Sequence, residues 1–255
     1  MLDRIARLSE RAKVSVAIGS AQEGDAADIT AARSLESGLG PIAVHRDPGA
    51  LVRALVEGEV DAAVRGTLPS HDVLPRLLET SGADAAMRVA LMDLGEGRTF
   101  MLAPVGIDEG RDLAERWALL QGAIRFATSL GIEPRVAVMS MGRAEDQHRG
   151  EAIALSHREC EALRSAAEAE GSLADCVGIQ LERAVQGHDV VIAPDGVTGN
   201  LIFRSLHLVA GHESWGAVAM GVTPLVFVDT SREKTDYLGA LHLARALAHL
   251  GPEDD

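Results

Sequence analysis

The sequence predicts an α/β protein with mostly parallel sheets and helices on both faces. Short apolar runs rich in β-branched residues alternate along the chain with longer runs that repeat apolar residues at helical spacing. This alternation is typical of strands that pair in parallel through helical crossovers. The chain has no internal repeat and no low-complexity linker. So many strand and helix units within 255 residues favour two lobes with a cleft between them.

The N-terminal part of the chain predicts strand–helix units and one hairpin. Leu2, Ile5 and Leu8 recur at helical spacing, and Pro48 opens a helix at a position where proline is tolerated. The Gly95-Glu96-Gly97 turn joins two apolar runs, so we expect these runs to form an antiparallel hairpin. We expect this hairpin to be the one departure from parallel pairing. The expected strands are 14–18, 41–45, 60–67, 87–94 and 98–103, and the expected helices are 2–12, 27–37, one from residue 48, and 73–80.

The C-terminal part continues the alternation. Gly131 ends a long helix, and a polar loop covers residues 141–150. The expected strands are 135–140, one near 177, 190–193 and 225–228, and the expected helices are 111–130, 156–170, about 181–185, 201–210 and 236–250.

The charge of the chain argues against nucleic acid and membrane surfaces as partners. Its 24 lysines and arginines face 38 aspartates and glutamates, which gives a net charge of −14. Binding to DNA or anionic lipid depends on basic residues that neutralise phosphates. Lys13 and Lys234 are the only lysines, so a clamp for phosphate or carboxylate has to be built from arginine forks.

The chain also predicts a cytoplasmic protein. It has no uncharged apolar run of about 18 or more residues, and its charged N-terminal helix lacks the apolar core of a signal peptide. Cys160 and Cys176 are too few and too isolated for a disulfide framework or a thiolate metal site. The nine histidines are scattered without a metal-binding spacing, so we expect no metal.

The stretch from residue 188 to 232 carries the strongest functional signal. An apolar run ends at Ala193 and is followed by a polar glycine-rich loop, and a second run ends at Val228 and is followed by Asp229-Thr230-Ser231-Arg232. Loops at the carboxyl ends of parallel strands are where open sheets collect ligands. The alternative is that these loops provide only turn and cap chemistry. The loop residues in question are Asp195, Gly199 and Asn200.

Two further strand ends add candidate anion ligands. Arg65-Gly66-Thr67 closes one strand, and Ser140 with Arg143 follows another, so Arg65, Arg143 and Arg232 form a possible arginine trio. Such a trio suits phosphate, pyrophosphate or carboxylate. The alternative is that each arginine makes an ordinary surface ion pair.

Ser231 is a candidate for the reacting centre. It would act as a nucleophile or hold a proton on a leaving group, although no His–Asp pair stands at a spacing that predicts a triad. Asp236 would orient or deprotonate a substrate, or it would cap the last helix.

Four motifs in series resemble the phosphate acetyltransferases and butyryltransferases. They cover nearly the whole chain in the family's order and spacing. The motifs are V-D-A-A-V-R-G-T at 60–67, G-I-E-P-R-V-A-V-M-S at 131–140, D-V-V-I-A-P-D at 189–195 followed by Gly199-Asn200, and the segment from Pro224 through D-T-S-R at 229–232.

The resemblance implies two α/β domains of the isocitrate and isopropylmalate dehydrogenase-like type. The first would comprise residues 1–110 and 224–255, the second 111–223, with the site in the interdomain cleft. In that family coenzyme A thiolate attacks an acyl phosphate, and dimers are usual. Carried over by resemblance, Ser231 and Arg232 are the family's Ser-Arg pair. Ser231 would stabilise or protonate the departing thiol, and the arginines would hold phosphate.

Three segments depart from that pattern. The family's aspartate seven residues after the serine, the base for the thiol, falls on Leu238, and Asp236 is an imperfect substitute. The segments 102–110 and 141–149 also differ from the family. These two segments resemble the archaeal MtxX branch, a methanogenesis marker labelled a "putative methyltransferase". No glycine-rich adenosylmethionine loop or corrinoid-type histidine motif supports methyl transfer.

The sequence therefore leaves three hypotheses for function. The first is a transferase for a phosphate- or coenzyme A-bearing small molecule, the second a methyltransferase or methyl-carrier accessory protein of methanogenesis, and the third a non-catalytic ligand-binding protein. We expect no permanently bound cofactor, coenzyme A as a possible substrate, a small-molecule phosphate or acyl or methyl donor as partner, and a homodimer. The candidate residues are Ser231, Arg232 and Asp236 for catalysis, and Arg65, Gly66, Thr67, Ser140, Arg143, Asp195, Gly199 and Asn200 for binding.

Overall fold

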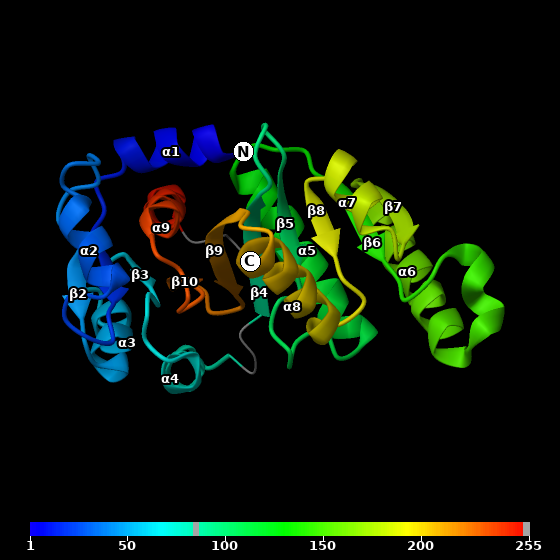
Figure 1. The fold of residues 1–255 in the computed structure, drawn as a ribbon, viewed down its shortest axis with the longest axis horizontal. Helices are drawn as coiled ribbons and strands as arrows, with labels where there is room; N and C mark the ends of the chain where they lie inside the picture. Colours follow the sequence, from blue (N-terminus) through cyan, green and yellow to red (C-terminus); the bar gives the residue numbers. More distant parts are fainter. Residues whose placement is uncertain (84–86, 252–255) are drawn as a thin grey trace. The chain divides into compact units, whose positions relative to one another are not determined.

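The chain forms two compact α/β units (Figure 1). The structure, a computed structural model, describes residues 1–83 and 87–251. The first unit comprises Met1–Ala86 and Ser214–Asp255, and the second comprises Met87–Glu213. Each unit has its own strands and its own covering helices.

The sheet of the first unit has the strand order β2-β1-β3-β10-β9. Strands β2, β1, β3 and β10 pair in parallel, and β9 pairs with β10 in antiparallel orientation. Parallel pairing aligns the carboxyl ends of β1, β3 and β10 at one edge, so the loops that follow these strands lie together. The strands are β1 (Val16–Gly19), β2 (Ala43–His45), β3 (Ala62–Val64), β9 (Glu213–Met220) and β10 (Val226–Asp229).

Apolar packing around Phe227 fixes the sheet of the first unit. Phe227 of β10 is fully buried beside Leu51 and Leu77, in a cluster that also includes Ala17 and Ala63 of the neighbouring strands. Helix α9 contacts β1, β3 and β10, and α1 packs along α9. The helices are α1 (Leu2–Arg11), α2 (Ala26–Arg33), α3 (Pro48–Val56), α4 (Ser70–Ser81) and α9 (Leu238–Leu250).

The sheet of the second unit has the strand order β4-β5-β8-β6-β7. Strands β4 and β5 form an antiparallel hairpin, and the remaining pairs are parallel. The strands are β4 (Met87–Asp93), β5 (Thr99–Ala103), β6 (Arg135–Met139), β7 (Leu173–Gly178) and β8 (Val190–Ile192). The helical segments are α5 (Leu113–Ser129), the 3₁₀ segment η1 (Ala144–Arg149), α6 (Glu151–Ala169), α7 (Leu181–Gly187), α8 (Gly196–Arg204) and the π-helical segment η2 (Ser205–Val209).

The predicted fold class is confirmed, and several elements differ from expectation. Helix α6 begins at Glu151 and not at residue 156, and the 3₁₀ segment η1 lies within the expected loop 141–150. Strand β9 was not predicted, and its antiparallel pairing with β10 is a second departure besides the hairpin. Its small residues around Gly216, which has a φ of 102°, gave no strand signal in the sequence. Helix α8 begins at Gly196 and not at residue 201, because the Asp195 carboxylate accepts the Thr198 N–H and caps it.

The compact units divide the chain near residues 86 and 214, whereas the sequence placed the crossings near 110 and 224. The difference comes from the hairpin and from β9. Strand β5 pairs with β8 of the second unit, and β9 pairs with β10 of the first. Backbone pairing therefore assigns β5 to the second unit and most of β9 to the first, the opposite of what the expected boundaries gave.

The two cysteines, too few and too isolated in the sequence to predict a disulfide framework, form a single bond. Cys160 of α6 and Cys176 of β7 are joined in a disulfide that the sequence did not predict. The two residues are 16 positions apart, and α6 turns back at Gly171 to pack directly on β7. Proximity in the fold, which spacing alone does not report, brings the thiols together. Of the helices in residues 1–83 and 87–251, none has the length and apolar character needed to span a membrane.

We expect Phe227→Ala to destabilise the protein by about 3–5 kcal/mol, because a buried aromatic side chain is lost and a cavity remains. Urea denaturation followed by circular dichroism measures the change. Leu35→Ala serves as the control, since Leu35 is 63% exposed, and it should change stability by less than about 0.5 kcal/mol. Equal effects of the two substitutions would contradict the placement of Phe227 in the core.

Candidate functional site

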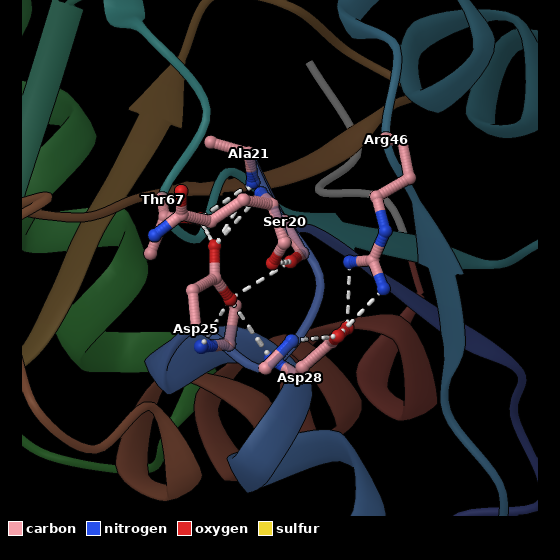
Figure 2. A network of polar contacts seen from close by, with 9 residues as sticks. Ser20, Ala21, Asp25, Asp28, Arg46 and Thr67 are labelled. Carbon is pink, nitrogen blue, oxygen red and sulfur yellow. Dashed lines mark hydrogen bonds and ion pairs between the residues drawn. The ribbon is translucent and has the colours of Figure 1, made fainter.

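The loop after β1 is organised by the carboxylate of Asp25 (Figure 2). Asp25 Oδ1 accepts the Ser20 hydroxyl at 2.8 Å and the Ala27 N–H at 3.0 Å, so the residue also caps α2. Its Oδ2 accepts the Ala21 N–H at 3.0 Å and the Thr67 hydroxyl. These backbone N–H groups would otherwise offer an anion site. The protein's own carboxylate occupies them, so this loop does not provide a phosphate cradle.

The hydrogen bonds to Asp25 also set its protonation. Burial alone raises the pKa of Asp25, but the hydroxyls of Thr67 and Ser20 and two backbone N–H groups outweigh it, so the pKa lies below its ordinary value of 3.8. Beside it, the Arg46 guanidinium donates two hydrogen bonds of 2.6 Å to Asp28 and lowers the pKa of that carboxyl (Figure 2). Both carboxylates are charged at neutral pH.

Arg65, at the end of β3, is a buried residue. Only 5% of Arg65 is exposed, its Nε donates to Asp229 of β10, and its Nη1 donates to the Leu68 carbonyl. The guanidinium therefore connects two neighbouring strand ends from inside the unit. The role of Arg65 as an anion clamp stays a prediction, because part of its hydrogen-bonding capacity serves the protein itself.

Gly66 and Thr67 join the three strand ends. Gly66 has a φ of 62°, and a Cβ there would lie 1.9 Å from the carbonyl oxygen of Gly19, so only glycine fits. The Gly66 carbonyl accepts the Thr230 hydroxyl at 3.0 Å. Thr67 Oγ1 accepts the Ala21 N–H at 2.8 Å. The loops after β1, β3 and β10 thus form one hydrogen-bonded group.

The loop after β10 presents a paired hydroxyl. Ser231 Oγ donates to Glu233 Oε2 at 2.5 Å, and the Glu233 N–H donates back to Oγ at 3.3 Å. The hydroxyl of Tyr237, a fully buried residue, donates to the Ser231 carbonyl at 3.0 Å. Burial raises the pKa of Tyr237, which keeps this phenol protonated as a donor. Lys234 is also buried and donates to the Ser214 carbonyl at 2.7 Å.

Arg232 and Asp236 stand on either side of this loop's turn. Arg232 is exposed, and within the described part of the chain it takes part in no ion pair. Asp236 accepts the Leu238 N–H at 2.7 Å at the start of α9 and pairs with Arg33 at 3.2 Å. The N-cap of α9 is Tyr237, so Asp236 precedes the cap and bonds only the first helical N–H, while its catalytic role stays a prediction.

In the second unit, the segment after β8, which comprises Asp195 and the first turns of α8, contacts the loop after β5. Asn200 Nδ2 donates to the Val105 carbonyl at 2.8 Å, and a Cβ at Gly199 would lie 1.9 Å from the Pro104 carbonyl oxygen. Asp195 accepts the N–H and hydroxyl of Thr198, each at 2.8 Å. These contacts serve cap and packing chemistry, the alternative considered for this loop. Binding roles for the three residues stay predictions.

The polar groups of the loop after β6 also bond mostly to one another. Ser140 is buried, and its hydroxyl donates to the Gly142 carbonyl at 2.7 Å. The Arg143 N–H donates to Asp146 at 3.0 Å, and Arg149 pairs with the same carboxylate at 3.1 Å. The guanidinium of Arg143 is exposed and forms an ion pair with Glu145 at 3.9 Å. Of the arginine trio, Arg232 is the member that takes part in no ion pair within the described residues.

The structure brings together, in the first unit, Arg65, Gly66, Thr67 and the loop that carries Ser231. It also adds residues that sequence reasoning missed. Sequence patterns assigned no role to Asp25, Glu233 or Lys234. A carboxylate two residues after the candidate serine was the available signal for Glu233. The added residues are Ser20, Asp25, Glu233, Lys234 and Tyr237.

We expect Asp25→Asn to remove part of the acid-dependent loss of stability. Because the folded pKa is depressed, the charged carboxylate stabilises the fold fully above its unfolded value of about 3.9, and this contribution disappears as pH falls through the lower folded pKa. The variant should lose about 1–3 kcal/mol at neutral pH and show a flatter stability profile below pH 4. Urea titrations at several pH values measure both effects. Glu57→Gln, at an exposed position, is the control, and identical profiles for wild type and Asp25→Asn would contradict this role.

The chain is similar in sequence to proteins of methanogenic archaea and similar in fold to a class of solved structures. No family model matches the chain. The chain is 39% identical over 252 residues to a protein of Methanopyrus kandleri named an uncharacterized methyltransferase, covering 96% of this chain and 93% of that protein. It is 34% identical over 238 residues to the "Putative methyltransferase mtx subunit X" of Methanosarcina mazei, covering 93% and 82%.

Solved structures share the fold at low sequence identity. A branched-chain phosphotransacylase from Enterococcus faecalis has a TM-score of 0.71 at 17% identity, covering 92% of this chain and 99% of that chain. A phosphotransacetylase from Staphylococcus aureus has a TM-score of 0.66 at 14% identity, covering 97% and 99%. These likenesses show a phosphotransacylase-like fold, and the relatives show the family. The chain belongs to the MtxX family of proteins from methanogenic archaea.

Proposed function

We propose that the protein is a transferase of the phosphate acyltransferase type, acting on a phosphate- or coenzyme A-bearing small molecule. The observation that carries this proposal is the loop after β10, where a serine hydroxyl bonded to a carboxylate stands next to an open arginine. Ser231 Oγ lies 2.5 Å from Glu233 Oε2, and Arg232 is exposed. A hydroxyl that handles protons beside a guanidinium that binds anions is suited to group transfer from an acyl phosphate.

The surroundings of the loop support this role. A guanidinium binds phosphate oxygens through two parallel hydrogen bonds, which holds a leaving phosphate in one orientation. The buried pair of Arg65 and Asp229 fixes the strand ends beneath the loop, and Tyr237 holds the Ser231 carbonyl. A reacting group on a fixed backbone is already held in the orientation that the reaction needs, which lowers the entropic cost of reaching the transition state.

Two other functions remain candidates on specific observations. The relatives' names favour a methyltransferase or a methyl-carrier accessory protein. Leu238, which stands where the acyltransferase pattern has an aspartate, favours a non-catalytic ligand-binding protein. The homodimer implied by the acyltransferase resemblance is likewise a proposal, and sedimentation velocity measures it.

We expect coenzyme A, acetyl phosphate or inorganic phosphate to raise the melting temperature of the wild-type protein. A ligand at 100 times its Kd stabilises a folded protein by about 2.7 kcal/mol. The shift should disappear in Arg232→Ala. It should persist in Arg7→Ala, which removes an exposed arginine of the N-terminal helix α1, distant in sequence from Arg232. Thermal-shift measurements on the three proteins test this expectation.

Adenosylmethionine and a methylcobamide belong in the same experiment. A response to either one, together with no response to coenzyme A and the phosphates, would overturn the acyltransferase proposal in favour of methyl transfer. Equal shifts in Arg232→Ala and wild type would remove Arg232 from the binding site.

A further inference from the structure

We propose that Glu233 is the proton acceptor of the transferase, acting through the hydroxyl of Ser231. This inference rests on the proposed function and assigns a residue that the acyltransferase resemblance does not include. The chemistry requires such an acceptor. A thiol with a pKa of about 8.5 is mostly protonated at neutral pH, and only the thiolate is strongly nucleophilic.

The hydrogen bonds of Ser231 determine which kind of group it faces. A serine hydroxyl has one proton to donate and two lone pairs that accept. The proton of Ser231 points to Glu233 Oε2 at 2.5 Å, and one lone pair receives the Glu233 N–H at 3.3 Å. The remaining lone pair can only accept. An incoming group that bonds to Ser231 Oγ must therefore be a donor, such as a thiol S–H.

This geometry reverses the role expected for Ser231 from the resemblance. A hydroxyl whose proton is already held by a carboxylate is a poor proton donor to a departing thiol and a good relay for a proton that arrives. A charged acceptor also makes this hydrogen bond stronger than a neutral one. Ser231 thus passes protons toward Glu233.

The transfer step balances without any further reactant. The thiol proton moves to Ser231 Oγ while the hydroxyl proton of Ser231 moves to the Glu233 carboxylate. The thiolate then forms a bond to the acyl carbon of the acyl phosphate, the bond between that carbon and the phosphate oxygen breaks, and phosphate leaves with the electron pair, held by Arg232. Glu233 is exposed, so it returns its proton to water.

The position of Glu233 is set by the fold and does not depend on a flexible side chain alone. The Ser231 carbonyl accepts the Tyr237 hydroxyl at 3.0 Å and the Lys234 N–H at 3.4 Å, which closes the turn that carries Glu233. The side chains of Tyr237 and Lys234 are buried. A carboxylate two residues after the serine can therefore serve where Leu238 supplies none.

The test is the pH dependence of acyl transfer from acetyl phosphate to coenzyme A by the purified full-length protein. In the wild type, kcat should vary little from about pH 6.5 to 8.5, because the protein removes the thiol proton. In Glu233→Gln we expect kcat to fall by about 100-fold or more near neutral pH. Its rate should then rise about tenfold per pH unit as the thiol ionises unaided, while the KM for acetyl phosphate is unchanged.

Two further variants make the result specific. Glu233→Asp keeps a carboxylate and should recover part of the rate with a profile like that of the wild type. Glu36→Gln makes the same amide substitution at an exposed position and should behave as wild type. Melting temperature and coenzyme A binding, measured on each variant, identify any variant that fails to fold.

The outcomes separate this inference from the proposed function. A wild type that binds coenzyme A but transfers no acyl group from any acyl phosphate overturns the proposed function and this inference with it. An active wild type together with a Glu233→Gln variant that keeps the wild-type rate overturns the inference alone. A slower Glu233→Gln variant with an unchanged pH profile also overturns it, because such a variant would show only a structural role.

Discussion

The buried ion pair between Arg65 and Asp229 is the interaction on which the candidate site depends. Taking two charges out of water costs several kcal/mol for each ion unless hydrogen bonds satisfy both. Here the Leu68 carbonyl accepts from Arg65, and Asp229 accepts the Thr230 N–H at 2.9 Å. These contacts fix the ends of β3 and β10 against each other. The loops that carry Thr67 and Ser231 leave the sheet from these fixed ends.

Hydrogen bonds to the protein's own carboxylates are a second constraint on where ligands can bind. Asp25 uses the backbone N–H groups of the loop after β1, and Asp146 uses the Arg143 N–H after β6. A carboxylate that already occupies such a group competes with any incoming anion. Under the proposed function, an anion would therefore bind through guanidinium groups that the protein's own carboxylates leave open. In the described residues Arg232 is the clearest example beside the serine.

Sequence patterns predicted the parallel α/β plan, the hairpin of β4 and β5, and the helix opened by Pro48, because periodicity and turn chemistry are local properties. Strand β9 escaped prediction because its several small residues have weak intrinsic strand preference, and because its pairing with β10 is a tertiary contact. For the site, Ser231 and Arg232 were visible as polar residues after a strand. The bond from Ser231 to Glu233 was not, since a serine and a nearby glutamate commonly face water independently.

The sequence by itself determined the fold class, the family likeness and the strand ends where polar residues gather, because each follows from the order and spacing of residues. Only the tertiary structure decided which polar groups are already used. Arg65 is buried in an ion pair, Arg232 is exposed, and Cys160 is joined to Cys176. The physical reason is that hydrogen bonds and burial depend on distances between residues far apart in the chain. Residue spacing constrains such distances only within a single helix, strand or turn.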